Sequence, residues 1–429
     1  MSPPPLRVAA NLFVVSKLGF PVARKKRKKM TKSMLFGVLV AAVATMQFSS
    51  TAMAEKVSPA LAKTLQAAQN ASKGKKWAEC LSNLRTADST AGKTAYDSYI
   101  INELTAFCAL SSNDVATATS AMQTNLGSPF AADKVAQRTR DLAKVFFNAR
   151  NYAKTVEIGR GAIKSGYADA DTFLVVAQSY YQQNDFKNAR EFTGSWIRDI
   201  EKRGQRPKEN AIQIYVTSCM RLRDEACTAA GFEKLVTYYP DPAGWANLMQ
   251  SLFATRNDVA AFNAYRLATE VGAMRAGDDY TEMAQRALEN DLPGEAQSAL
   301  EAGFARKAFT DKRDIDRNTR LLATAKERAA ADRVGLAKAD KEAAAGNSGD
   351  VDLRVGQAYM SYGQYAAAVT AIQRGIAKGN VTDPAEAQMA LGIAQLRAGN
   401  KSEASKAFRA VKGDADTRRV AKLWSLRAQ

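Results

Sequence analysis

The order of small, aromatic and large apolar residues in the C-terminal part of the chain predicts a tandem repeat of helical hairpins. Four positions of one unit match four positions of the next at the same separation of 36 residues: Gly356 and Gly392, Gly363 and Gly399, Ala368 and Ala404, Ile372 and Phe408. A fixed period of roughly 20–50 residues is typical of helix-turn-helix units stacked in series. A single unit of this kind cannot bury its apolar face alone, so neighbouring units are expected to share one core.

The same kind of register is present in the N-terminal half. Leu142 and Ala143 are followed 34 residues later by Val176 and Ala177. Helix starts are predicted where a Ser or Asp, which can accept a hydrogen bond from a free backbone N–H, precedes a proline, which has no N–H to leave unsatisfied. Such pairs are Ser58-Pro59, Ser128-Pro129, Asp241-Pro242 and Asp383-Pro384. Few segments alternate polar and apolar residues, so we predict an all-α fold with little strand.

The repeat resembles the tetratricopeptide repeat (TPR) family. That pattern has an apolar residue beside a small one, an aromatic residue three positions later, glycine at the turn, and alanine four positions before a large apolar residue. The matching residues here are Val355, Gly356, Tyr359, Gly363, Ala368 and Ile372. The resemblance implies a right-handed superhelical α-solenoid in which the first helix of each hairpin lines a concave face.

Composition and repeat spacing divide the chain beyond its N-terminus into three segments. Residues 55–308 are predicted to form an N-terminal TPR-like solenoid. Residues 350–429 are predicted to form a C-terminal pair of repeats with a capping helix at 415–427. Between them, residues 309–349 are densely charged with only a thin apolar stripe, and they end in a glycine-containing turn or hinge. We expect long, partly exposed helices there, arranged as an atypical pair.

Residues 1–54 have the three parts of a secretory signal peptide. The basic run Arg24–Lys29 is followed by the apolar run Met34–Met46 and by the small-residue cleavage site Ala52-Met53-Ala54. The apolar run is shorter than the ~20 residues that a helix needs to cross a bilayer. We therefore expect cleavage after Ala54 and a periplasmic mature protein without a transmembrane anchor. A nuclear localisation or nucleic-acid-binding segment is the alternative for the basic run, and the true start of the chain is left open.

The predicted cleavage changes what the net charge implies. The whole chain carries a formal charge of +18, and residues 1–54 contribute nine cationic side chains and no acidic one. The mature chain would keep +9, with its charges interspersed along the predicted helices. A nucleic-acid-binding protein needs a clustered basic patch, so the sequence argues against nucleic acid as a partner.

Four cysteines indicate disulfides in an exported protein. Cys219 and Cys227 flank a short turn between two predicted helices, and Cys80 and Cys108 lie on consecutive predicted helices. We predict bridges between Cys219 and Cys227 and between Cys80 and Cys108. The alternative is four buried free thiols, because cysteine is often a core residue.

Catalytic chemistry has little support in this sequence. The chain has no histidine, which excludes Ser-His-Asp and Cys-His catalysis and His-ligated zinc. The segment Gly159–Ser165 has the wrong spacing for a phosphate loop and lies within a predicted helix. Asp278 and Asp279 fit an N-cap better than a catalytic carboxylate pair. We expect no enzyme activity, no cofactor and no metal.

The TPR resemblance also implies which side chains face a partner on the concave side. These are Arg140, Lys144, Phe147 and Asn148 in one repeat, Gln178, Tyr181 and Gln182 in the next, and Gln357, Met360, Ile393, Leu396 and Arg397 in the C-terminal pair. Arg140, Lys144 and Asn148 are spaced four residues apart and so share one helical stripe. That stripe suits an acidic tail or a C-terminal carboxylate, whereas the C-terminal groove is more apolar and suits a peptide or an amphipathic helix.

Two functions from different classes follow from these observations. The first is a non-enzymatic periplasmic scaffold or adaptor that binds a protein or peptide of a cell-envelope complex on its concave face. The second is a factor that handles cell-wall glycan or polysaccharide, with Tyr181, Trp196, Tyr238 and Tyr239 as stacking candidates. An enzyme is a remote third. Partner identity and association between copies of the chain are left open.

Overall fold

The protein is described by a computed structural model that covers residues 56–253, 255 and 257–428. Every regular element in these residues is helical, so the all-α prediction is confirmed. The predicted signal peptide, residues 1–54, lies outside the described residues. The chain divides into two compact units, Met1–Arg150 and Asn151–Gln429. No helix among the described residues combines the length and the apolar character needed to cross a membrane.

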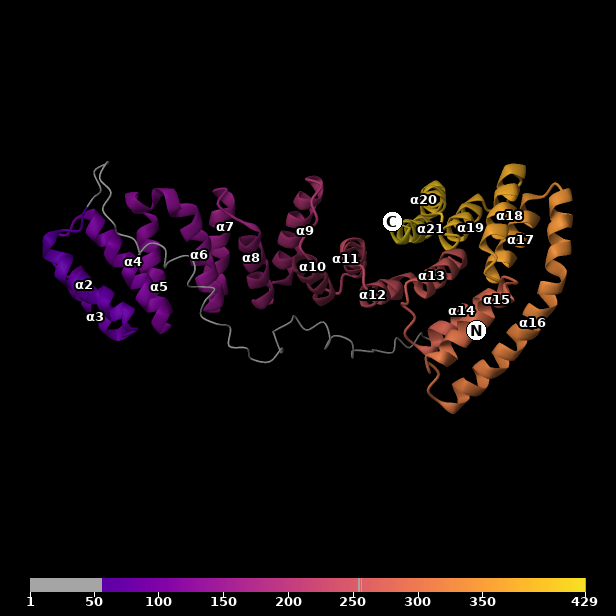
Figure 1. Cartoon of the computed structure of the whole chain (residues 1–429), viewed down its shortest axis with the longest axis horizontal. Helices are drawn as coiled ribbons and strands as arrows, with labels where there is room; N and C mark the ends of the chain where they lie inside the picture. Colours follow the sequence, from indigo (N-terminus) through magenta and orange to yellow (C-terminus); the bar gives the residue numbers. More distant parts are fainter. Residues whose placement is uncertain (1–55, 254, 256, 429) are drawn as a thin grey trace, which may run out of the picture. The chain divides into compact units, whose positions relative to one another are not determined.

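Unit 1 consists of two antiparallel hairpins and a further helix (Figure 1). Its elements are α2 (Pro59–Lys73), α3 (Trp77–Asp88), α4 (Ala95–Ser112), α5 (Val115–Leu126), the 3-10 helix η2 (Pro129–Lys134) and α6 (Val135–Asn148). Leu61, Leu84 and Leu104 form part of the buried core of α2–α4. In the structure Cys80 of α3 is joined to Cys108 of α4 by a disulfide.

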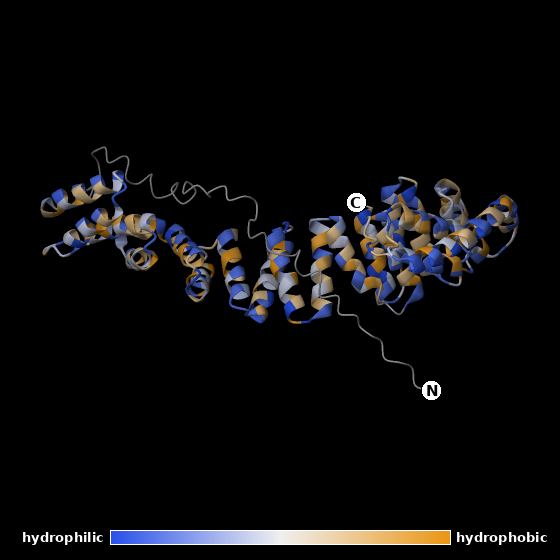
Figure 2. Ribbon diagram, turned by 90° about the horizontal axis from the view of Figure 1, so that it is seen from below, coloured by the Kyte–Doolittle hydropathy of each residue, from blue (hydrophilic) through white to orange (hydrophobic). Residues whose placement is uncertain are grey.

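Unit 2 begins with a series of hairpins in which each helix packs on its neighbours. These helices are α7 (Tyr152–Lys164), α8 (Ala170–Gln182), α9 (Phe186–Lys202), α10 (Glu209–Arg221), α11 (Glu225–Tyr238), α12 (Pro242–Phe253), α13 (Asp258–Glu270), α14 (Gly277–Glu289) and α15 (Pro293–Ala305). In the structure Cys219 of α10 is joined to Cys227 of α11 by a disulfide. Figure 2 shows hydrophilic and hydrophobic residues mixed along the helical ribbons, as amphipathic packing requires.

The remainder of unit 2 contains α16 (Lys312–Ala345), α17 (Gly349–Ser361), α18 (Tyr365–Lys378), α19 (Pro384–Arg397), α20 (Lys401–Ala410) and α21 (Ala415–Arg427). The charged segment is one helix of 34 residues and not the expected pair. Its buried side chains Asn318, Ala325, Ala329, Leu336 and Ala343 are spaced by seven or four residues, so they form one continuous stripe on a single helix. No proline interrupts them.

The predicted helix starts and the repeat register both have a structural reason. In each of the four predicted pairs the proline is the first residue of an element, namely α2, η2, α12 or α19. A Cβ atom built on Gly356 would lie 2.4 Å from Ile372 Cγ1, and one built on Gly392 would lie 2.4 Å from the Phe408 ring. The 36-residue register therefore repeats one contact, in which a glycine of the first helix accepts a large side chain of the second.

Unit 2 differs from a simple row of hairpins at its end. Helix α21, predicted as a cap, is present and also packs on α13, which precedes it by more than a hundred residues. The indole Nε1–H of Trp424 donates a hydrogen bond to the carbonyl of Asn263 (3.1 Å), and Asn257 donates to Asp414 (2.6 Å). The C-terminal repeats thus fold back on the middle of the same unit.

Candidate functional site

In unit 1, the predicted polar stripe lies on α6. Leu142, Ala143, Val145 and Phe146 form the buried face of this helix. Arg140, Lys144 and Phe147 are partly exposed and Asn148 is exposed. The helix therefore presents two cationic side chains and an amide on its accessible side. Their role in binding stays a prediction.

In unit 2, the second predicted set lies on α8. Val176, Ala177 and Tyr180 are buried, whereas Gln178 and Tyr181 are partly exposed and Gln182 is exposed. The Tyr181 ring packs edge-on against Phe186, with 5.2 Å between the ring centroids. This contact holds the Tyr181 ring against the first residue of α9.

The C-terminal set has a different environment from the one expected. Met360, Ile393 and Leu396 have exposed fractions of 2%, 0% and 8% and belong to the core that also contains residues of α13 and α21. The cause is the fold-back of the chain, because its own helices fill the space where an open groove was expected. In this arrangement these three side chains are not accessible to a partner.

The two polar members of that set are engaged within the chain. Gln357 donates a hydrogen bond to Glu386 (3.0 Å). Arg397 lies 3.5 Å from the carboxylate of Glu270 and 3.9 Å from that of Glu295. Both residues therefore belong to an internal polar cluster rather than to an open surface.

Arg266 of α13 is the centre of this cluster. Its side chain is fully buried, and its Nε donates to Glu295 of α15 at 2.9 Å. Its Nη1 donates to Asn263 (3.2 Å) and lies 3.8 Å from Glu386 of α19. The guanidinium carbon also lies 4.1 Å from the centroid of the Phe262 ring. A buried cation is thus balanced by carboxylates from two other helices.

Glu386 of α19 is a titratable group of this cluster whose pKa is raised. Burial raises its pKa to about 7, although the charge of Arg266 and a hydrogen bond from Asn263 act in the opposite direction. Burial prevails because Arg266 already pairs with Glu295 at a shorter distance and makes no hydrogen bond to Glu386. Arg266 Nη2 and Glu295 Oε1 are buried without a hydrogen-bond partner in the described part of the chain.

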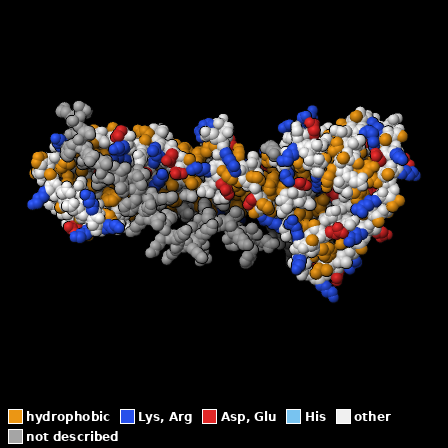
Figure 3. Space-filling view, viewed as in Figure 1, with side chains coloured by type: hydrophobic (Ala, Val, Ile, Leu, Met, Phe, Trp, Pro, Cys, Tyr) orange, Lys and Arg blue, Asp and Glu red, His pale blue; other side chains and the backbone are white. Residues whose placement is uncertain are grey.

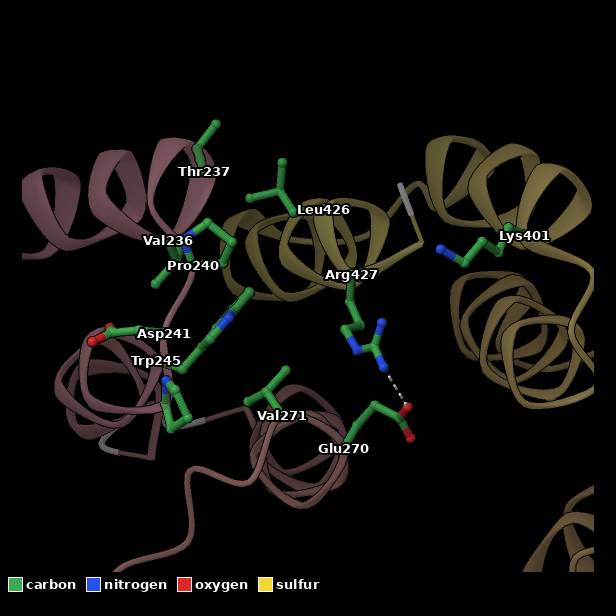
Figure 4. Close-up of a pocket in the computed structure, with 11 residues that line it drawn as sticks. Val236, Thr237, Pro240, Asp241, Trp245, Glu270, Val271, Lys401, Leu426 and Arg427 are labelled. Carbon is green, nitrogen blue, oxygen red and sulfur yellow. Dashed lines mark ion pairs between the residues drawn. The ribbon is translucent and has the colours of Figure 1, made fainter. Parts of the chain in front are cut away.

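A pocket with a volume of about 520 Å³ lies beside this cluster (Figure 4). Its walls come from the ends of α11, α12 and α13 and from α20 and α21. They consist of Val236, Thr237, Pro240, Asp241, Pro242, Trp245, Glu270, Val271, Lys401, Leu426 and Arg427. Glu270 connects the pocket to the buried cluster, because its carboxylate lies 3.6 Å from Arg427 and 3.5 Å from Arg397. The volume is within the range of small-ligand or single-side-chain sites.

The aromatic residues considered for glycan stacking are mostly engaged within the chain. Trp196 is 4% exposed and stacks on Phe173, with 5.1 Å between the ring centroids. Tyr239 donates to the carbonyl of Pro207 (2.8 Å) and is covered by Arg206, whose guanidinium lies 3.8 Å from the ring centroid. Tyr238 donates to Glu201 (3.1 Å). These contacts leave little open aromatic surface for a sugar ring.

Among the described residues, charged side chains form no group that could hold a metal ion, and the face seen in Figure 3 carries no single dominant basic patch. Within residues 56–428, apart from 254 and 256, no three acidic or cysteine side chains come together as metal ligands would. Figure 3 shows basic and acidic side chains interspersed over the visible face of the described residues.

Among known proteins, the chain matches solved structures only. No model of a protein family matches this sequence, and no curated protein matches it. The C-terminal part of a TPR repeat-containing protein from Cytophaga hutchinsonii is 15% identical, covers 59% of this chain and 98% of its own, and has a TM-score of 0.32. A tetratricopeptide repeat protein from Parabacteroides merdae is 10% identical, with coverages of 76% and 98% and a TM-score of 0.30. The TPR2AB domain of yeast Sti1, solved with pHSP90, is 13% identical, with coverages of 70% and 100% and a TM-score of 0.25.

The pocket and the buried cluster were missed by sequence reasoning, although one signal was present. From Val259 to Ala268, Arg266 is the only charged residue and Asn263 the only amide in an otherwise apolar run. A helix that is apolar on all sides is buried on all sides, so a cation within it must be paired. The partners Glu295 and Glu386 lie too far along the chain for any local pattern to show them.

Proposed function

We propose that this protein is an exported, non-enzymatic adaptor that binds a segment of a cell-envelope protein in the periplasm. The signal-peptide features of residues 1–54 support export, and the helical-hairpin architecture supports a binding role over a catalytic one. The observation that carries the proposal is the exposed polar side of helices whose opposite side is fully packed. On α8, Gln182 is exposed and Gln178 and Tyr181 are partly exposed, whereas Val176, Ala177 and Tyr180 are buried.

The chemistry of these faces suits an extended peptide. Amide side chains donate and accept hydrogen bonds at once, so Gln178 and Gln182 can pair with the backbone of a bound segment. On α6, Arg140 and Lys144 add positive charge that favours an acidic segment. Each face belongs to its own unit and is proposed as a contact surface in its own right.

Export is tested by cell fractionation and N-terminal sequencing. We expect the protein in the periplasmic fraction with Glu55 as its first residue. A protein found in the cytoplasm with residues 1–54 still attached would contradict the proposed location.

Partner binding is tested by photo-crosslinking in living cells. A crosslinking amino acid is placed at Gln182 on α8 or at Asn148 on α6, both exposed, and at exposed Ser195 on α9 as the control. We expect a discrete crosslinked product from Gln182 or Asn148, to be identified by mass spectrometry, and none from Ser195. Equal products from all three positions would indicate unspecific contact.

The glycan alternative is an outcome of a second, simple assay. Purified cell-wall sacculi are sedimented with the protein at low and high salt. We expect the protein to stay in the supernatant at high salt. Salt-resistant pelleting would instead favour glycan binding.

A further inference from the structure

The outward side of α16 carries the most exposed large apolar side chain of the described residues. Val334 is 87% exposed, whereas the next, Ile315 of the same helix, is 40% exposed. Successive residues of a helix are about 100° apart, so Val334 points away from Leu336, which is buried. Figure 1 shows α16 along the outer side of α14, α15, α17 and α18, which pack against its other side. A single exposed valine is common on protein surfaces, so its neighbours decide whether this side of α16 is a contact surface.

The side chains near Val334 on this side are small. Ala331 and Ala337 lie three residues before and after it, and both are exposed. Ala323 and Ala345 lie eleven residues before and after it, and both are also exposed. Residues at these separations share one face of a helix. A second helix can approach this face closely, because the distance between packed helices depends on the side chains at the contact.

Two charged side chains on the same face have opposite signs on the two sides of Val334. Glu327 lies seven residues before it and Lys341 seven residues after it, and both are exposed. Neither forms an ion pair within the part of the chain that the structure describes. Lys338, also on this face, is already balanced by Glu342 of the same helix at 3.7 Å. The positions around Val334 are therefore alike where they are apolar and opposite where they carry unpaired charge.

This order matches a second copy of the same helix that runs in the opposite direction. When two identical helices pack antiparallel about a twofold axis at Val334, each position before Val334 in one copy meets the position equally far after it in the other. Ala331 then meets Ala337, and Glu327 meets Lys341 in two equivalent ion pairs. In a parallel pair each of these charges would meet its own kind, and like charges repel.

We propose that the protein forms a homodimer through the outward side of α16, packed antiparallel with Val334 at the twofold axis. The helices that pack on α16 lie on its other side and leave this side accessible. One helix from each copy, with small side chains at its centre, buries little area, and interfaces of this size are weak and transient. The inference does not depend on binding at α6 or α8. If those faces bind a partner, a dimer presents each of them twice and raises the avidity for a repeated ligand.

The dimer is tested by analytical ultracentrifugation of the purified protein between about 1 and 200 µM, the range in which a weak dimer dissociates. We expect a monomer–dimer equilibrium. Glu327→Lys and Lys341→Glu should each weaken it about tenfold, because each turns both ion pairs into contacts between like charges. An equimolar mixture of the two variants should recover the affinity, because opposite charges then meet between unlike copies. Glu289→Lys, the same reversal at an exposed position of α14, should leave the equilibrium unchanged.

Each other result of this experiment contradicts the proposal. A monomer at every concentration would overturn it and leave the outward side of α16 to a different protein. A dimer that neither reversal weakens would place the contact elsewhere on the chain. Weakened variants whose mixture does not recover would overturn the antiparallel arrangement. Thermal unfolding of each variant checks that it is folded, which we expect because both positions are exposed.

The direction of packing is tested with single cysteines and a short bismaleimide crosslinker. In the antiparallel pair, residue 323 of one copy lies opposite residue 345 of the other, and each lies about 33 Å from its own counterpart. We therefore expect crosslinked dimers from a mixture of Ala323→Cys and Ala345→Cys and none from either variant alone. Crosslinking of each variant with itself would indicate a parallel pair and overturn the proposal, as would a mixture without crosslinks. The unaltered protein, whose cysteines form two disulfides, is the control.

Discussion

The guanidinium of Arg266 and the carboxylate of Glu295 lie 2.9 Å apart, with side chains that are 0% and 7% exposed. They connect α13 to α15, and through Glu386 the same cation reaches α19. Three helices are therefore joined by charged side chains. These side chains can become solvated only if the C-terminal repeats separate from the middle of unit 2. Such a pair favours the one packing of these helices in which both charges are buried together, because burying either charge alone would cost free energy.

Removal of one charge of this pair should be strongly destabilising. Arg266→Met leaves Glu295 and Glu386 buried without their cation, and we expect a loss of about 3–5 kcal/mol in the free energy of unfolding. Urea unfolding followed by circular dichroism measures it. Lys338→Met is the control, because Lys338 forms an exposed pair with Glu342 in which both side chains are more than half exposed, and it should change stability little. Similar losses in both variants would show that the burial of the charge is not the cause.

The raised pKa of Glu386 predicts a pH-dependent stability. The ordinary pKa of a glutamate is 4.5, and the pKa of Glu386 in the folded protein is about 7. Between these pH values the folded state therefore keeps a proton that the unfolded state has released. The stabilising contribution of Glu386 to the free energy of unfolding is therefore fully present below about pH 4.5 and is lost as pH rises through about 7. The groups near it are Arg266, Glu295 and Asp383.

Glu386→Gln removes the titration of residue 386. The difference between this variant and the unaltered protein therefore isolates the effect of Glu386 from the titration of all other groups. Relative to this variant, the unaltered protein should lose on the order of 2 kcal/mol in unfolding free energy between pH 5 and pH 8. Urea unfolding of both proteins across this range gives the difference directly. Parallel pH profiles would show that Glu386 does not titrate there.

The local part of this fold could be predicted from the sequence, and the long-range part could not. Glycine at 356 and 392 and a large side chain at 372 and 408 encode a hairpin contact within about one repeat, so spacing alone reveals it. The contact of Trp424 with Asn263 joins residues separated by 161 positions. No periodicity records such a pairing, and Ile393 therefore looked like a groove residue although it is a core residue. The accessible positions of α6 and α8 could be predicted because the TPR resemblance implies which side of each helix faces away from the core, and positions on one side of a helix recur with its period.

The repeat glycines should not tolerate a side chain. In Gly392→Ala the new methyl group would lie 2.4 Å from the Phe408 ring, and we expect a loss of roughly 1–3 kcal/mol from overpacking. Gly161→Ala on α7 is the matched control, because a Cβ there meets nothing within 4 Å. It should stabilise by about 0.5–1 kcal/mol, since alanine loses less backbone freedom than glycine in a helix. Thermal unfolding of both variants measures the two effects, and the same sign in both would contradict the packing explanation.

The two disulfides should contribute unequally to stability. The bridge from Cys80 to Cys108 closes a sequence separation of 28 residues, and that from Cys219 to Cys227 closes 8. Because a longer closed loop restricts the unfolded chain more, Cys80→Ala/Cys108→Ala should lose about 1 kcal/mol more than Cys219→Ala/Cys227→Ala. Urea unfolding of the two double variants measures the difference, and thiol titration of the unfolded, unreduced protein should find no free thiol. Four titratable thiols would show that neither bridge forms, and the difference between the double variants would then have to come from packing of the buried cysteine positions.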